Sequence, residues 1–130
     1  MELQFFICRH CGNVVVKFHD SGVPLVCCGE PMERLTPNTV EASVEKHLPF
    51  LLHQDKQTLQ VQVGSKEHPM LEEHHIEFVC VECETCFQVI HLKPGTPPHA
   101  VFCLRCTPRA VYAYCNIHGL WRTDVPKSRD

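Results

Sequence analysis

From residue 58 onward, hydrophobic and polar residues alternate in short stretches with a period of two. In the stretch TLQVQV, residues 58–63, three aliphatic side chains are separated by two glutamines, which predicts a strand with one buried face. The same kind of pattern predicts further strands at residues 76–81, 87–92, 100–104 and 110–114. The stretch KPGTPP at residues 93–98 predicts a tight turn, and the one helix we expect is a short one near residues 39–46. Short strands separated by turns are typical of a β-sandwich, so we expect an all-β fold.

The N-terminal part of the chain has a weaker pattern. Two apolar runs, at residues 14–16 and 23–26, are separated by the turn sequence DSG, which predicts a hairpin. The polar, proline-containing stretch LTPNT at residues 35–39 is typical of a linker. We therefore expect a small domain over residues 1–36 and a larger one over residues 37–130.

The composition argues against several classes of protein. The chain has 130 residues and a net charge of −3, and it contains no basic cluster, so we expect no nucleic-acid partner. No stretch approaches the roughly 20 apolar residues of a membrane span. The start, MELQFFICRH, lacks the features of a secretory signal. We therefore expect a cytoplasmic protein with no membrane partner.

The ten cysteines and ten histidines are the most informative feature of the composition. In a secreted chain this much cysteine would indicate a disulfide framework, but beside so much histidine and without a signal peptide it indicates metal binding. A segment of about 40 residues buries too little apolar surface to fold by core packing alone. We therefore expect a metal, or else disulfides, to stabilise the first domain.

Four of these cysteines form a pattern in the first domain. The pair Cys8-x2-Cys11 is followed, after 15 residues, by the adjacent pair Cys27-Cys28. Four thiolates in tetrahedral geometry suit either zinc or iron. Neighbouring residues of a strand point to opposite sides, so the second pair can reach one metal only if the backbone bends there. A zinc knuckle and a pair of disulfides remain alternative interpretations of the spacing.

The sequence around these cysteines resembles the desulforedoxin-type domain. The resemblance is carried by FFICRHCGNVVV and CCGEPMERL, which together span most of the segment. It implies that Cys8, Cys11, Cys27 and Cys28 bind one rubredoxin-like iron, and that this iron stores or relays one electron.

The histidines gather at one predicted edge of the larger domain. His68 and His74 come just before the strand predicted at residue 76, and Cys115 and His118 follow the last predicted strand. If successive strands run antiparallel, these four side chains converge at one edge of the sandwich. Neutral imidazoles and a thiolate are ligands for metals such as iron. A single histidine is more often a surface or hydrogen-bonded residue, so the argument depends on the group.

The motifs around these residues resemble the catalytic domain of superoxide reductases, and the whole chain is similar to the desulfoferrodoxin family. The matching motifs are EKH, HPM-x3-H and CN-x-HGLW. The resemblance implies an immunoglobulin-like β-sandwich in which four equatorial histidines and one axial cysteine hold a square-pyramidal iron, namely His47, His68, His74, His118 and Cys115. It also implies two irons per chain, one-electron reduction of superoxide to hydrogen peroxide, a rubredoxin-like external electron donor and a homodimer.

Two further residues gain a role from the EKH match. The resemblance implies that Lys46 attracts the superoxide anion, and that Glu45 can occupy the sixth position of the ferric iron. From charge alone, a solvated surface lysine is the better interpretation of Lys46, and a surface carboxylate is the alternative for Glu45.

Neither resemblance accounts for a second set of cysteines. Cys83-x2-Cys86 and Cys103-x2-Cys106, with 16 residues between the pairs, fit the spacing of a zinc ribbon. If residues 87–92 pair with residues 100–104, Cys86 lies near Cys103. We therefore expect a third site, holding one structural zinc, with two disulfides or free thiols as the alternatives. Cys80 lies inside a predicted strand, where we expect it to pack in the core.

Three other functions compete with superoxide reduction. A rubredoxin-like electron carrier would use the four-cysteine iron but leaves the histidine motifs unexplained. A structural or adaptor zinc protein would have only closed sites. A superoxide dismutase would make oxygen as well as peroxide and would need no external reductant.

Overall fold

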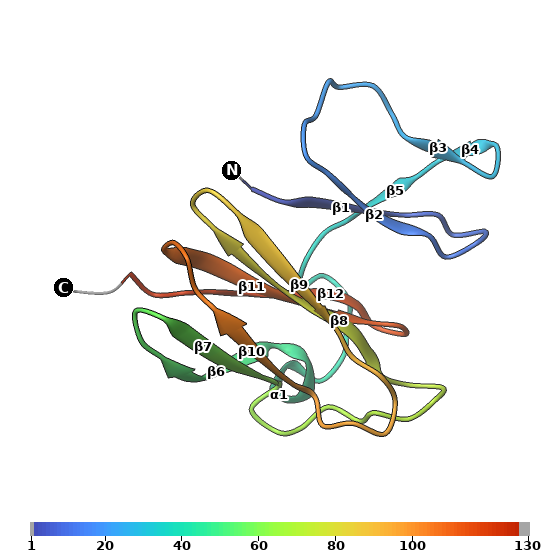
Figure 1. Cartoon of the computed structure of the whole chain (residues 1–130). Helices are drawn as coiled ribbons and strands as arrows, with labels where there is room; N and C mark the ends of the chain where they lie inside the picture. Colours follow the sequence, from blue (N-terminus) through green and yellow to red (C-terminus); the bar gives the residue numbers. More distant parts are fainter. Residues whose placement is uncertain (1, 128–130) are drawn as a thin grey trace. The chain divides into compact units, whose positions relative to one another are not determined.

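The computed structural model describes residues 2–127, and the chain divides into two compact units, Met1–Thr36 and Pro37–Asp130. The regular elements of both units are strands, apart from one four-residue helix in the larger unit, as expected for an all-β fold (Figure 1). Each unit has its own sheets, and each is described by itself below.

The smaller unit contains a three-stranded antiparallel sheet and a two-residue ladder. The sheet has the order β2-β1-β5, and the ladder joins β3 to β4. The strands are β1 (Gln4–Ile7), β2 (Val14–Lys17), β3 (Val26–Cys27), β4 (Glu30–Pro31) and β5 (Glu33–Leu35). Only a few apolar side chains are buried in this unit, and most of them lie on or next to β1 and β5: Leu3, Phe5, Ile7 and Leu35. This core is very small, in keeping with the need for a metal.

The predicted hairpin between residues 14–16 and 23–26 is wrong. The first run forms β2, which pairs with β1, and β3 pairs with β4. The DSG turn is present, because the Asp20 carboxylate accepts hydrogen bonds from the Gly22 amide and from Lys17. It nevertheless opens into an irregular segment, since β1 offers β2 a continuous partner.

The larger unit consists of two sheets that enclose its core. One sheet has the order β10-β7-β6 and the other has the order β12-β11-β8-β9. The elements of this unit are α1 (Val44–His47), β6 (Pro49–Gln54), β7 (Thr58–Val63), β8 (Ile76–Cys83), β9 (Phe87–His91), β10 (His99–Cys103), β11 (Pro108–Cys115) and β12 (Gly119–Asp124). Within residues 2–127, no helix has the length and apolar content that crossing a membrane requires.

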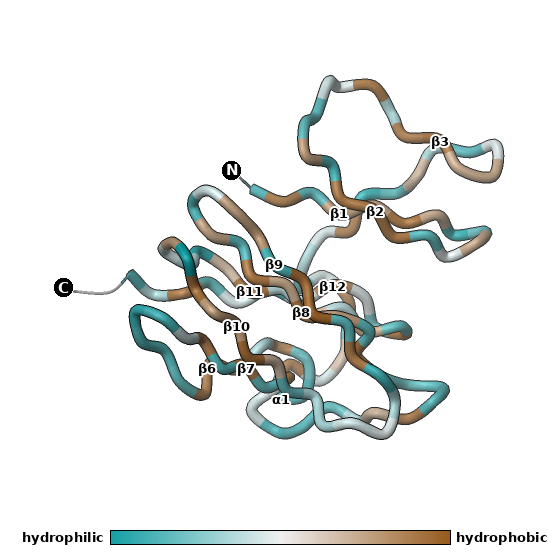
Figure 2. The backbone as a smooth tube through the Cα atoms, in the orientation of Figure 1, coloured by the Kyte–Doolittle hydropathy of each residue, from teal (hydrophilic) through white to brown (hydrophobic). Residues whose placement is uncertain are grey.

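The core of this unit lies between the inner faces of the two sheets. One side comes from β7 and β10, including Leu59, Val61 and Phe102, and the other comes from β8 and β11, including Val79 and Val111. Figure 2 shows hydrophobic colour along much of β7, β8 and β10, and hydrophilic colour in the loop that joins β6 to β7. The period-two pattern therefore identified the buried faces correctly.

The predicted strand positions agree with the structure, but one predicted pairing does not. The strand at residues 58–63 matches β7, and the other four predicted strands overlap β8, β9, β10 and β11. The expected pairing of residues 87–92 with residues 100–104 is wrong, because β9 pairs with β8 whereas β10 pairs with β7 in the opposite sheet. The intervening turn therefore carries the chain from one sheet to the other.

The antiparallel pair β8 and β11 sets the positions of the histidines and of the second set of cysteines. At one end of the pair Cys115 lies opposite Ile76, and at the other end Pro108 lies opposite Cys83. The loops that carry the histidines meet at the first end, and the second set of cysteines lies at the other.

Strand β10 offers a direct test of the two-sheet core. Phe102 is 1% exposed, whereas its neighbour Val101 is 55% exposed. We expect Phe102→Ala to reduce the free energy of unfolding by about 3–5 kcal/mol, because it empties a buried volume. Val101→Ala should cost about 1 kcal/mol or less. Urea unfolding at equal metal content measures both, and similar losses in the two variants would contradict the assigned faces.

Candidate metal centres

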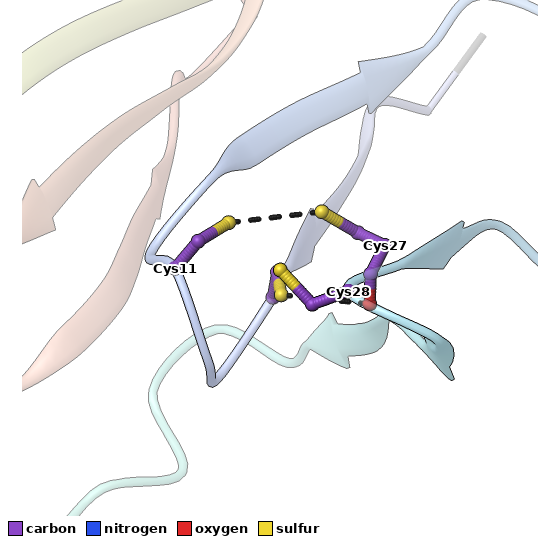
Figure 3. A group of neighbouring side chains, drawn as sticks. Cys11, Cys27 and Cys28 are labelled. Atoms are coloured by element: carbon purple, nitrogen blue, oxygen red, sulfur yellow. Dashed lines mark hydrogen bonds between the residues drawn. The ribbon is translucent and has the colours of Figure 1, made fainter.

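The four cysteines of the smaller unit lie together at its turns. Their sulfur atoms are all within 4.8 Å of one another, and Cys11 Sγ lies 3.6 Å from Cys27 Sγ (Figure 3). The backbone bends where the adjacent pair requires it, because Cys28 has a φ of 53°. Gly12, with a φ of 85°, closes the turn after the first pair by donating its amide to the Cys8 carbonyl at 2.8 Å.

The electrostatics of this group fit a bound cation. The backbone amide of Cys11 donates to the Cys8 sulfur and lowers the pKa of that thiol to about 6. Hydrogen bonding to the neighbouring Cys8 and Cys11 sulfurs raises the pKa of Cys28 to about 12. Four sulfurs this close cannot all ionise unless a positive charge lies among them. The donor set, four thiolates, is one that iron and zinc both accept.

In the larger unit, four imidazole rings surround one point. Going round this ring of histidines, the neighbouring centroids lie 4.6–5.1 Å apart and the ring planes meet at 75–85°. The rings follow the order His68, His47, His118, His74. The centroids of His47 and His74, which face each other across the group, are 6.3 Å apart. The topological prediction that these loops converge is therefore confirmed.

Hydrogen bonds to carbonyl groups determine which ring nitrogen carries the proton. Nδ1 of His47 lies 2.7 Å from the Ser43 carbonyl, and Nδ1 of His68 lies 2.7 Å from the Pro69 carbonyl. A carbonyl oxygen can only accept, so both Nδ1 atoms are protonated and both Nε2 atoms carry lone pairs. These two Nε2 atoms lie 3.2 Å apart.

The other two histidines complete the same arrangement. Nδ1 of His118 lies 3.0 Å from Nε2 of His47. Nε2 of His74 is buried, and among the described residues it has no hydrogen-bond partner. The lone pairs on Nε2 of His47 and Nε2 of His68 face each other and repel, and a metal cation between them removes the repulsion. These observations indicate that the residues fit a metal ion.

Cys115 provides a sulfur beside the four rings. It is fully buried, its Sγ accepts the His118 amide at 3.3 Å, and the same Sγ lies 4.0 Å from Nδ1 of His118. Burial raises the pKa of Cys115. Burial also lowers the pKa of His47 and lowers that of His68 to about 4, so these imidazoles are neutral at pH 7. A divalent cation would favour the Cys115 thiolate.

Comparisons with known proteins identify a family for both the unit with the four cysteines and the unit with the histidines. The family model for desulfoferrodoxin matches residues 39–124, and the model for its N-terminal domain matches residues 1–35. The chain belongs to the desulfoferrodoxin family. It is 41% identical to a desulfoferrodoxin of Syntrophotalea carbinolica, over 95% of this chain and 97% of that one.

Two further relatives carry a functional name. A superoxide reductase of Thermococcus kodakarensis is 34% identical over 62% of this chain and 86% of its own length. The crystal structure of the superoxide reductase from Treponema pallidum superposes with a TM-score of 0.79 at 29% identity, covering 95% of this chain and all of that one. Both desulfoferrodoxin units of this chain therefore have known counterparts.

The two residues of the EKH motif before His47 lie in α1, which overlaps the short helix expected near residues 39–46. Lys46 is exposed, and its positive charge adds to burial in lowering the pKa values of His47 and His74. Glu45 instead forms an ion pair with Lys66 at 3.6 Å. The structure therefore brings Lys46 close to the candidate site and directs Glu45 toward a neighbouring lysine.

Asn116 and Trp121 hold the loops that carry the histidines in place. The Asn116 side chain accepts the His75 amide at 2.9 Å and donates to the Glu73 carbonyl at 3.1 Å, which clamps the backbone on both sides of His74. Trp121 stacks on His47 at 4.9 Å and donates to the His118 carbonyl at 3.1 Å. Both residues lie in the CN-x-HGLW motif, but periodicity gave no sign of their contacts.

Gly64 lets the backbone of the next loop approach α1. A Cβ atom added at this position would lie 2.5 Å from the Glu45 carbonyl oxygen and 2.8 Å from the carbonyl carbon of Lys46. Ser65 Oγ also donates to the Glu45 carbonyl, at 3.2 Å. The position of His47 therefore depends on a residue with no side chain, which nothing in the sequence pattern indicated.

The structure brings together three of the four cysteines expected in the third site. Cys83, Cys86 and Cys106 have sulfurs within 4.8 Å of one another. Cys103 is not in the group, because side chains on β10 alternate and Cys103 lies on the exposed face, next to the buried Phe102. Cys80 is fully buried, as expected.

We expect Gly64→Ala to weaken iron binding at the histidine group by about 10- to 100-fold, because the new methyl group must displace α1 and with it His47. The matched control is Ser65→Ala, which removes one exposed hydrogen bond to the same carbonyl and adds no atoms. Chelator competition, followed by iron analysis, measures the affinity. Equal affinity in the two variants would show that α1 moves without disturbing His47.

Proposed function

We propose that this protein is a superoxide reductase, which reduces superoxide to hydrogen peroxide at an iron held by His47, His68, His74, His118 and Cys115. The observation that carries the proposal is the arrangement of four imidazole rings around one point beside a buried thiol, in which the lone pairs of His47 and His68 face each other. A protein that only carried electrons through the four-cysteine group would leave this arrangement without a role.

The reaction consumes one superoxide, one electron and two protons and yields one hydrogen peroxide. The iron, when bound, would supply the electron, and the thiolate ligand would increase its electron density. The chain provides five donors, one fewer than an octahedral iron accepts, which leaves one position for the substrate. Burial lowers the pKa of His47 and of His68, so these two imidazoles are neutral at pH 7 and do not repel a cation.

Lys46 is proposed to attract the anionic substrate. The protein as a whole carries a net charge of −3, so attraction must come from local positive charge. Lys46 is exposed, its charge acts on His47 and His74, and its ammonium group can also donate hydrogen bonds. Glu45 is proposed as the carboxylate that occupies the sixth position of the ferric iron, which would require it to leave its ion pair with Lys66.

The four-cysteine group is proposed to bind the second iron and to store or relay one electron. Its exposed members, Cys11 and Cys28, give an outside protein access to the site, which supports an external rubredoxin-like donor. Apolar side chains exposed on the same unit support a homodimer: Phe18, Val23 and Val26. None of the ten cysteines, all of which lie within residues 2–127, forms a disulfide, which supports a cytoplasmic location.

The stoichiometry of turnover tests the function. With a reductant present, we expect one hydrogen peroxide for each superoxide consumed and no oxygen. Without a reductant, consumption should stop after the stored electrons are used. Continued consumption without reductant, with oxygen released, would identify a dismutase instead.

Cys115→Ser should abolish the sulfur-to-iron charge-transfer absorption of the ferric histidine site and most of the activity, because serine cannot replace the thiolate. Cys80→Ser is the control, since Cys80 is also fully buried but lies outside the group. Visible spectra at equal iron content give the answer. If the band survives in Cys115→Ser, the sulfur ligand is a different residue.

Lys46→Ala should slow the bimolecular reaction with superoxide by about tenfold at low ionic strength and should weaken its dependence on salt. Lys56→Ala is the charge-matched control, because Lys56 is also exposed and lies ~20 Å along β6 from α1. Pulse radiolysis gives the rates. Equal slowing by both variants would mean that only net charge matters.

A further inference from the structure

The third group of cysteines joins two loops at the end of the larger unit away from the histidines. Cys83 ends β8, and Cys86 precedes β9 in the same hairpin. Cys106 lies in the connection from β10 to β11. The amide of Glu84 donates to the Thr107 carbonyl at 3.1 Å, which holds the two loops against each other. The three sulfurs are therefore brought together by backbone contacts that do not involve the sulfurs themselves.

The distances between the sulfurs suit a shared metal better than a disulfide. Cys86 Sγ lies 3.4 Å from Cys106 Sγ, and all three sulfurs are within 4.8 Å of one another. Thiolates that bind zinc at about 2.3 Å lie ~3.8 Å apart in tetrahedral geometry. A disulfide needs about 2.05 Å and would use only two of the three sulfurs, leaving the third as an unpaired thiol in the group.

The four-cysteine group of the smaller unit provides an internal comparison. There Cys11 and Cys27 lie 3.6 Å apart, and Cys8, the first residue of its Cys-x2-Cys pair, is buried whereas the second is exposed. Cys83 is likewise buried, and Cys86 is more exposed. Both groups thus place a Cys-x2-Cys turn around a point that a further cysteine reaches from a distant segment.

We propose that Cys83, Cys86 and Cys106 bind one thiophilic divalent cation of the zinc type, which clamps the β8–β9 hairpin to the β10–β11 connection. Three thiolates from the chain leave the fourth tetrahedral position to water, because Cys103 lies on the outer face of β10. The metal keeps the same oxidation state in this role. The clamp adds stability to the end of the unit where the hairpin of one sheet meets the connection between the two sheets.

The clamp and the proposed reaction can be measured separately. Cys83 is seven residues along β8 from Ile76, which lies opposite Cys115, so the two ends of the strand are ~23 Å apart. Loss of the cation should therefore lower thermal stability and leave the absorption of both iron sites unchanged.

The experiment uses the full chain, purified anaerobically with a reductant and loaded with both irons. Zinc and iron are counted per chain, after addition of Zn²⁺ and removal of the excess, in the wild type, Cys106→Ser, Cys86→Ser and Cys103→Ser. Cys103→Ser is the matched control, because it removes a cysteine of the same Cys-x2-Cys motif that lies outside the group. We expect one zinc in the wild type and in Cys103→Ser, none in the other two variants, and equal iron in all four.

Other results would overturn the proposal. Absence of zinc from the wild type would do so, as would a Cys86–Cys106 disulfide found by mass spectrometry in the reduced preparation. Zinc lost equally in Cys103→Ser would contradict the assignment to these three thiolates. If Cys86→Ser fails to fold, Cys106→Ser still decides, because Cys106 lies in a connecting loop outside the strands.

Discussion

The antiparallel pairing of β8 with β11 is the constraint on which the rest of the larger unit depends. It places Ile76 opposite Cys115, and so brings the loop that precedes β8 to the turn that follows β11. His74 enters from the first loop, and Cys115 and His118 come from the second. Asn116 then joins the two loops through its side chain. The strand pairing thus brings the two loops together, and side-chain hydrogen bonds then fix the positions of the residues within them.

The donors that this pairing gathers would repel one another without a cation. Carbonyl groups fix the protons of His47 and His68 on the outer nitrogens, which leaves the inner lone pairs face to face. The same reasoning applies to the thiols of the smaller unit, whose core is too small to fold by burial alone. Metal binding and folding are therefore linked in both units, and removal of the metals should cost stability as well as activity.

Much of this could be predicted from the sequence, because period-two alternation marks strands and the order of strands sets which loops meet. The strand at residues 58–63 and the convergence of the histidine loops followed from those two rules. The edge strand β6 was harder to find. Strand β6 exposes Phe50 and Leu52 and contains an irregularity between Leu51 and His53, so its pattern is broken. Cys103 was misplaced because spacing does not determine which sheet its strand joins. The importance of Gly64 could not be predicted from the sequence. It depends on the absence of a side chain at a point where the backbone comes close to α1.

The central claim is that the histidine–cysteine group holds an iron that transfers one electron to superoxide. Anaerobic stopped-flow spectroscopy of the fully reduced protein, mixed with one equivalent of superoxide, tests it most directly. We expect a sulfur-to-iron charge-transfer band to form in the visible region as one equivalent of hydrogen peroxide appears, without oxygen. A protein that stays colourless after mixing, or forms the band without peroxide, would contradict the account.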